Sequence, residues 1–161
     1  MNGMLITGGC GFIGSNFIRL AMRKLPKCRV INLDKLTYAG NHLGLADVDQ
    51  DSRYRFHKGD ICDVKLVERL FSEECIDTVV YFAAESHVDR SIAGTDEFIR
   101  TNIMGTFTLL EASLKAWFSD SSPGTLNRSR FLHVSTDEVY GSPGEIRHYA
   151  STLKSMPPKT N

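Results

Sequence analysis

The chain has 161 residues, and its 19 basic and 19 acidic side chains leave no formal net charge at neutral pH, which argues against a surface built for nucleic acid or for an anionic membrane. This length suits one domain with a sizeable hydrophobic core, and no apolar run is long enough to span a bilayer. The four cysteines (Cys10, Cys28, Cys62 and Cys75) form no CxxC pair and no metal-ligand spacing, so we expect reduced thiols, no metal site and a cytoplasmic protein.

Short apolar runs alternate with helical patterns along the chain. Runs that are apolar on both faces, as covered parallel strands require, stand at residues 4–7, 30–33, 78–82 and 130–134, with a weaker one at 54–58. Helical patterns stand at residues 12–24, at 63–74 with Asp63 as the N-cap, and from about 95 to 118. The alternation predicts an α/β fold over residues 1–145, a doubly wound, Rossmann-like parallel sheet with strand order 3-2-1-4-5.

A glycine-rich loop, TGGCGFIGS, lies between the first expected strand and the first expected helix. Gly8, Gly11 and Gly14 have the spacing G-x-x-G-x-x-G, and Gly9 gives the narrower G-x-G-x-x-G with the last two. Such glycines permit a tight turn, close approach of the backbone to a pyrophosphate and close packing of helix on strand. A flexible turn is the alternative explanation of the loop by itself.

An acid at the end of the second expected strand gives the loop its context. Asp34 lies twenty positions after Gly14, where an acid binds the ribose 2′-OH of a dinucleotide and would repel the 2′-phosphate of NADP. The sequence therefore predicts NAD as the cofactor. Asp60 and Ile61 follow the third strand and could flank the adenine, although a capping turn into Asp63 explains them as well.

Two adjacent acids follow the last expected strand, in the stretch HVSTDEVYG at residues 133–141. Asp137 and Glu138 would lie at the carboxyl end of the sheet, where open α/β sheets bind their ligands. A pair of carboxyls with separated pKa values could act as an acid and a base on one substrate. The alternative is that Thr136 or Asp137 caps a following helix and that Glu138 is solvated.

Several segments together resemble a known family. They are LITGGCGFIGSNFIR, INLDKLTYAGN, GDICD, YFAAESHVDRSI, TNIMGT and HVSTDEVYG. The chain resembles the extended short-chain dehydrogenase/reductases, and within them the sugar-nucleotide 4,6-dehydratases. FAAESHVDRSI and STDEVYG are the discriminating segments, since related epimerases typically carry small neutral residues where Asp137 and Glu138 stand.

The resemblance implies a role for each matching position. The cofactor residues would be Gly8, Gly11 and Gly14 with Phe12 and Ile13 at the pyrophosphate; Asp34, Lys35, Leu36 and Thr37 at the adenosine ribose; Asp60 and Ile61 at the adenine; and Phe82, Ala83, Ala84 and Ser86 at the nicotinamide, with Thr101 nearby. Ser86 and Thr136 would touch the sugar, and Thr136, Asp137 and Glu138 would form the catalytic group. The substrate would be a dTDP- or UDP-hexose, and the protein a homo-oligomer, a dimer paired through residues 95–118.

The chemistry of a dehydratase explains the need for two acids. Oxidation of a hexose at C4 makes the C5 hydrogen acidic and places the C6 hydroxyl β to the new ketone. Elimination of water then needs a base at C5 and an acid at the departing oxygen. The resemblance assigns Asp137 as the acid and Glu138 as the base, whereas their spacing alone permits either order.

The end of the sequence departs from the family pattern. The family carries Y-x-x-x-K after the STDEVYG segment, but Tyr140 is followed four places on by Gly144, and Tyr149 by Leu153. Residues 146–161 show no resemblance, and Pro157-Pro158 disfavours a helix there. We therefore expect a loop-like or disordered tail, no substrate domain in this chain and a last strand left as an uncovered sheet edge that favours association. A catalytically inactive NAD-binding or assembly module and a nucleotide-sugar epimerase are the alternatives.

Overall fold

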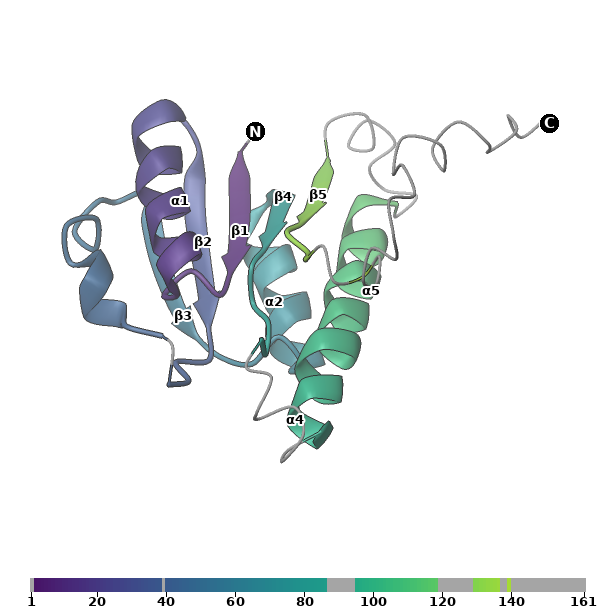
Figure 1. Cartoon of the computed structure of the whole chain (residues 1–161). Helices are drawn as coiled ribbons and strands as arrows, with labels where there is room; N and C mark the ends of the chain where they lie inside the picture. The colour runs from purple at the N-terminus through teal and green to yellow at the C-terminus, as the bar shows by residue number, and fades with distance from the viewer. Residues whose placement is uncertain (1, 39, 87–94, 119–128, 137–138, 140–161) are drawn as a thin grey trace, which may run out of the picture.

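The computed structural model describes residues 2–38, 40–86, 95–118, 129–136 and 139. Strands and helices alternate along this part of the chain (Figure 1). In chain order the elements are β1 (Gly3–Thr7), α1 (Phe12–Lys24), β2 (Arg29–Asp34), η1 (His42–Leu45), β3 (Tyr54–Lys58), α2 (Val64–Glu74), β4 (Ile76–Tyr81), α4 (Thr95–Ile99), η2 (Arg100–Gly105), α5 (Thr106–Trp117) and β5 (Arg130–His133).

The five strands form one parallel sheet in the order β3-β2-β1-β4-β5. The predicted fold class and the predicted order 3-2-1-4-5 are therefore confirmed, including the weaker strand at residues 54–58. Helix α1 covers one face of the sheet, and α2 and α5 cover the other (Figure 1). Because the strands are parallel, the carboxyl ends of β1, β2 and β4 lie together at one end of the sheet.

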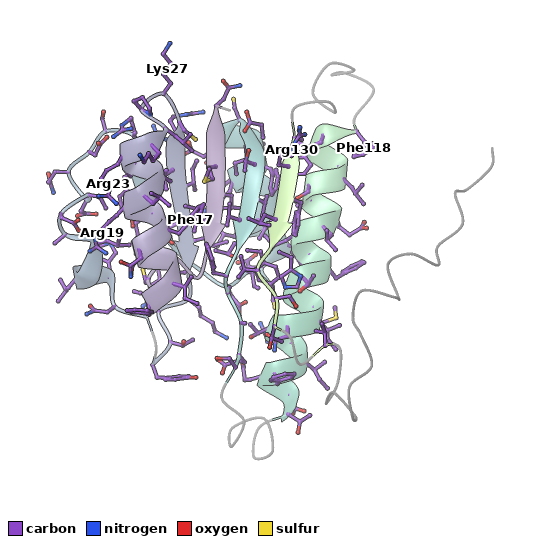
Figure 2. All side chains as sticks on the ribbon, turned by 45° about the horizontal axis from the view of Figure 1, so that its top comes forward. Phe17, Arg19, Arg23, Lys27, Phe118 and Arg130 are labelled. Atoms are coloured by element: carbon purple, nitrogen blue, oxygen red, sulfur yellow. The ribbon has the colours of Figure 1, made fainter. Side chains whose placement is uncertain are left out.

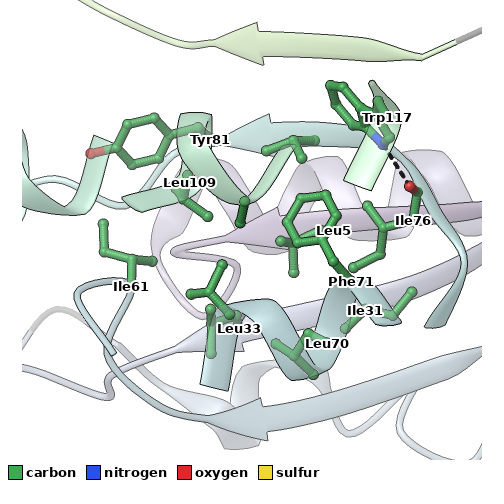
Figure 3. Close-up of a cluster of buried hydrophobic side chains, with 13 residues drawn as sticks. Leu5, Ile31, Leu33, Ile61, Leu70, Phe71, Ile76, Tyr81, Leu109 and Trp117 are labelled. Atoms are coloured by element: carbon green, nitrogen blue, oxygen red, sulfur yellow. Dashed lines mark hydrogen bonds between the residues drawn. The ribbon is translucent and has the colours of Figure 1, made fainter. Parts of the chain in front are cut away.

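Each covered face of the sheet has its own hydrophobic core. Successive residues of a strand point to opposite faces, so Leu5 packs towards α2 and α5 whereas Met4 and Ile6 pack towards α1. All five residues of β1 are buried for this reason. Figure 3 shows the larger cluster, in which the indole N–H of Trp117 donates a hydrogen bond of 2.8 Å to the carbonyl of Ile76. The bond ties the end of α5 to the start of β4.

Helix boundaries follow local signals in the sequence. The carboxylate of Asp63 accepts the amide of Leu66 at 3.1 Å, so the predicted N-cap of α2 is confirmed. The predicted long helix is also present, as α4, η2 and α5 without a break, but its middle six residues form a π-helix that the sequence pattern did not indicate. Gly105 ends this π-helical stretch, and a Cβ there would lie 2.3 Å from the Ile61 side chain. The glycine lets the helix approach the end of β3 closely.

The outer surfaces differ in character. Figure 2 shows the basic side chains of Arg19, Arg23 and Lys27 along the outer side of α1 and beyond its end. β5 is a terminal strand of the sheet, and Leu132 on it is 51% exposed. Within the described ranges no helix combines the length and the apolar character needed to cross a bilayer, and no His/Cys/Asp/Glu cluster there could hold a metal.

Candidate functional site

A solvent-open cleft with an empty volume of about 630 Å³ lies at the carboxyl ends of the central strands. Open α/β sheets bind ligands at this position, where the strand order reverses. The cleft is lined by Gly8, Gly11, Leu33, Asp34, Lys35, Thr37, Gly40, Gly59, Asp60, Ile61, Phe82, Ala83, Ala84, Glu85 and Thr101. One wall thus comes from the glycine loop and the end of β2, and the other from the segment after β4.

The glycine loop needs its glycines for different physical reasons. Gly8 has φ of +68°, and a Cβ there would lie 2.7 Å from the backbone of Ala83. Gly14 lies against the loop, since its Cβ would stand 2.4 Å from the carbonyl of Gly8. A Cβ at Gly11 would meet that carbonyl at 3.3 Å and nothing else within 4 Å. Gly8 and Gly14 therefore shape the loop, whereas Gly11 keeps the cleft open.

The first turn of α1 offers backbone amides at the glycine loop. Gly11 is the N-cap and makes no side-chain cap, and the first turn contains no acidic residue. The N–H groups of a first helical turn have no carbonyl partner within the helix and carry a partial positive charge. Phe12 is 86% exposed, so this end of α1 is open to solvent. The arrangement suits a phosphate-bearing ligand.

Asp34, the last residue of β2, holds the backbone of two segments, the glycine loop and the turn after β2. Its carboxylate accepts the amide of Cys10 at 2.8 Å through Oδ2 and the amide of Leu36 at 2.8 Å through Oδ1. Leu36 takes a positive φ of 55°, and this bond stabilises that turn. Asp34 is only 8% exposed, yet it lines the cleft, and each carboxylate oxygen can accept more than one hydrogen bond.

A buried polar cluster of Asn32, Tyr54 and Cys10 supports the glycine loop from the interior of the protein. Asn32, within β2, donates its amide to the hydroxyl of Tyr54 at 2.9 Å and to the thiol of Cys10 at 3.5 Å. Burial raises the pKa of Cys10 to about 11, with a further contribution from the nearby Asp34 carboxylate. Burial also raises the pKa of Tyr54 to about 12, against the hydrogen bond from Asn32. Cys10 and Tyr54 therefore stay neutral at physiological pH and, with Asn32, act as structural supports.

Asp60 and Lys35 form the rim of the cleft beyond Asp34. Lys35 Nζ lies 3.1 Å from Asp60 Oδ2, and Asp60 Oδ1 accepts the amide of Cys62 at 2.9 Å. Burial alone would raise the pKa of Asp60, but the amide of Cys62 and the ammonium of Lys35 outweigh it and lower that pKa. Asp60 thus lines the cleft and also stabilises the turn into Asp63, while its expected place beside an adenine stays a prediction.

The segment after β4 is held by the long helix. Asn102 accepts the amide of Glu85 at 3.0 Å and donates to the carbonyl of Glu85 at 2.8 Å, so one side chain binds both backbone polar groups of that residue. Tyr81 donates to the carbonyl of Thr101 at 3.3 Å and accepts from the hydroxyl of Thr106 at 3.0 Å. These bonds fix the second wall of the cleft against η2.

The sequence located most of this cleft in advance. The predicted residues that line it are Gly8, Gly11, Asp34, Lys35, Thr37, Asp60, Ile61, Phe82, Ala83, Ala84 and Thr101. Predicted residues that do not line it are Phe12, Ile13, Gly14, Leu36, Ser86 and Thr136, although Phe12, Leu36 and Ser86 are next in sequence to lining residues. Asp137 and Glu138 lie outside the described residues, so their predicted role stays a prediction.

Four lining residues were missed by the sequence analysis: Leu33, Gly40, Gly59 and Glu85. Three of them adjoin predicted residues, so proximity to Asp34, Asp60 and Ala84 was an available signal. Gly40 had no such signal, because it reaches the cleft only through the turn after β2, where a Cβ would lie 3.1 Å from Asp34 Oδ1.

Comparison with known proteins places this geometry in a family. The family model described as GDP-mannose 4,6 dehydratase matches residues 5–157. The chain belongs to the GDP-mannose 4,6-dehydratase family. The match includes the last three residues of β1, the glycine loop and every lining residue of the cleft.

Individual relatives within and around the family agree with this assignment. The dTDP-glucose 4,6-dehydratase of Haemophilus influenzae is 49% identical over 142 residues, which are 88% of this chain and 41% of that protein. A Streptomyces venezuelae dTDP-glucose 4,6-dehydratase crystallised with NAD has a TM-score of 0.75 at 49% identity, covering 87% of this chain and 41% of that one. A UDP-glucose 4-epimerase of Thermotoga maritima has a TM-score of 0.63 at 32% identity, covering 71% and 34%. The chain thus spans about two fifths of the dehydratases it matches.

Replacing Gly8 by alanine should destabilise the protein by about 2 kcal/mol or more, because a side chain there meets both an unfavourable φ and the backbone of Ala83. Urea unfolding followed by circular dichroism measures the loss. Gly44→Ala is the matched control, since a Cβ at Gly44 meets nothing within 4 Å, and it should change stability by about 0.5 kcal/mol at most. Equal losses for the two variants would contradict the role given to Gly8.

Proposed function

We propose that this chain is the NAD-binding part of an NAD-dependent dTDP-glucose 4,6-dehydratase, which converts dTDP-glucose to dTDP-4-keto-6-deoxyglucose. The observation that carries the proposal is the cleft in which the glycine loop, the open end of α1 and Asp34 meet. Residues 1–145 would form the cofactor domain, as the sequence predicts. The dTDP-glucose 4,6-dehydratases among its relatives and the NAD bound to one of them support this assignment.

The residues of the cleft fit a dinucleotide. Gly11 leaves room at the N-terminus of α1 for a pyrophosphate, and the amides of that first turn face the loop. Asp34 keeps acceptor capacity for the hydroxyls of the adenosine ribose. Asp60 and Ile61 would flank the adenine, while Phe82, Ala83 and Ala84 would line the nicotinamide end.

The acid group after β5 would perform the elimination. NAD, when bound, would supply the removal of hydride from C4 of the sugar and its return at C6, and the tyrosine of the family's Y-x-x-x-K motif, which this sequence lacks after residue 141, would take the C4 hydroxyl proton. Between these two steps Glu138 would take the proton from C5, and Asp137 would protonate the departing C6 oxygen. Thr136 and Ser86 would bind the sugar. The two carboxyls can divide these tasks only if one is ionised and the other protonated.

A UDP-glucose 4-epimerase is the second candidate, favoured by the structural similarity to the Thermotoga enzyme. An epimerase oxidises C4 but eliminates no water, so it has no use for two acids at this place. The sequence Thr136-Asp137-Glu138 therefore favours the dehydratase. The assay below separates the two, because only one of them removes the C6 hydroxyl.

The long helix offers a surface for pairing with a second copy. Its exposed apolar side chains form a stripe at three- and four-residue spacing, the arrangement of a helix-pairing face: Ile99, Ile103, Phe107, Leu110, Leu114 and Phe118. An apolar stripe over about five helical turns is larger than the scattered apolar residues of a monomer's surface. We infer a homodimer through α4 and α5.

Isothermal titration calorimetry on this chain should detect NAD binding. Gly11→Val should weaken that binding at least tenfold, because its branched side chain would fill the space left at the N-terminus of α1. Gly44→Val is the control in open space, and NAD affinity should stay within about twofold of the unaltered chain. Absence of NAD binding by the unaltered chain would contradict the proposed function.

The catalytic roles can be tested after this chain is joined to the C-terminal half of the Haemophilus relative. Asp137→Asn and Glu138→Gln should each lower kcat for 4-keto-6-deoxy sugar formation by about 10²- to 10⁴-fold. Glu73→Gln, an exposed acid on α2, should leave kcat unchanged. An unchanged kcat in both acid variants would refute the roles, and a C4 epimer as the product would favour the epimerase.

Phe107→Glu should convert the dimer to a monomer in sedimentation velocity, because it places a charge in the middle of the apolar stripe of α5. Leu43→Glu makes the same change at an exposed leucine on η1, outside the stripe, and should leave the dimer intact. A monomeric unaltered chain, or a dimer that survives Phe107→Glu, would contradict pairing through this helix.

A further inference from the structure

An ion-pair cluster joins the rim of the cleft to the start of the long helix. Lys35 Nζ lies 3.1 Å from Asp60 Oδ2 and 3.1 Å from Glu97 Oε2. Arg100 lies 3.7 Å from the same oxygen of Asp60. Lys35 and Asp60 follow β2 and β3, whereas Glu97 belongs to α4, 62 residues further along the chain than Lys35. Lys35 therefore meets its second acidic partner, Glu97, only because the fold brings α4 next to the end of β2.

Lys35 stands where a basic side chain would alter cofactor choice. It follows Asp34 directly, at the strand end that would hold the adenosine ribose under the proposed function, and it lines the cleft. Enzymes that use NADP place a basic residue in this region to bind the 2′-phosphate. A lysine beside Asp34 therefore works against the discrimination that the aspartate provides, unless its charge is neutralised.

The cluster neutralises that charge. Lysine has three N–H donors, and Lys35 directs two of them to Asp60 and Glu97. Counted with Asp34, the rim holds three carboxylates and the two cations Lys35 and Arg100, which leaves it with one net negative charge. Without the charge of Glu97 the same rim would be neutral, and Lys35 would keep Asp60 as its one acidic partner in the described part of the chain.

We propose that Glu97 is a specificity-determining residue that acts through Lys35: it holds the Lys35 ammonium away from the ribose and neutralises its charge, so that Lys35 does not bind the 2′-phosphate of NADP. The proposal rests on the proposed function, because it assigns a cofactor choice to the same cleft. Glu97 is not among the residues that line the cleft but contacts Lys35, which is, so it acts through Lys35. The carboxylates also keep Lys35 charged: burial lowers its pKa, but the bonds to Asp60 and Glu97 raise it by more.

The size of the effect follows from the exposure of the pair. Glu97 is 60% exposed and Lys35 41%, so their interaction is screened by solvent and salt. Exposed ion pairs contribute little to folding stability, so we expect loss of the Glu97 charge to leave the fold intact. A doubly charged 2′-phosphate senses the same charges, and an effect of about two- to fivefold on affinity is expected.

The test is a set of dinucleotide affinities measured by calorimetry on the full chain, with NAD and NADP as the two probes. Glu97→Gln should lower the ratio of the NADP to the NAD dissociation constant by about two- to fivefold at low salt, and less at high salt. In a chain that already carries Lys35→Gln, adding Glu97→Gln should leave the ratio unchanged. Glu68→Gln is the matched control, because Glu68 forms a 2.7 Å ion pair with Lys115 outside the cleft, and it should leave the ratio unaltered.

Each outcome has a separate meaning. An unchanged ratio in Glu97→Gln overturns the proposal while NAD binding by the unaltered chain upholds the proposed function. A change that persists in the Lys35→Gln background, or that Glu68→Gln reproduces, overturns it too, because the effect would then be a general one of charge. Failure of the unaltered chain to bind either dinucleotide overturns the proposed function and this inference together.

Discussion

The carboxylate of Asp34 holds together the end of the sheet on which the candidate site is built. It binds the amide of Cys10 in the glycine loop and the amide of Leu36 in the turn after β2, and each bond is 2.8 Å long. Hydrogen bonds to an ionised carboxylate are among the stronger ones in proteins, and this carboxylate is nearly buried. One side chain therefore sets the loop after β1 against the turn after β2. Under the proposed function it also faces the ribose, so the shape of the cleft and the choice of cofactor share a residue.

The remaining parts of the cleft are fixed by similar bonds from distant elements. Asn32 supports the glycine loop from within β2, and Asn102 holds the backbone of Glu85 from η2. The groups that these side chains bind, in Cys10 of the glycine loop and in Glu85 after β4, lie outside regular strands and helices. Their pairing lets loops at the edge of the sheet keep one conformation. Rigid walls of this kind suit the binding of a large ligand with little loss of conformational entropy.

The predictions made from the sequence succeeded where local chemistry decides the structure. The strands and the N-cap at Asp63 follow from apolar runs and from a capping side chain, and the strand order follows from the doubly wound fold class that the alternation of elements indicates. Gly8 and Gly14 were recognised because a positive φ or a close contact excludes other residues. The π-helical stretch that begins at Arg100 was not foreseen, since it departs from the α-helical period only within the folded helix. The roles of Asp137 and Glu138 stay predictions.

The sequence by itself determined the alternation of strands and helices, the glycine loop and the acid at the end of β2, because each depends on residues near one another in the chain. The tertiary structure alone decided which distant groups meet: Glu97 with Lys35, Asn102 with Glu85, and Tyr54 with Asn32. Such contacts leave no periodic pattern in the sequence. Their partners are brought together by the sheet order and by the packing of the long helix, and this distance along the chain is the physical reason that only the folded molecule reveals them.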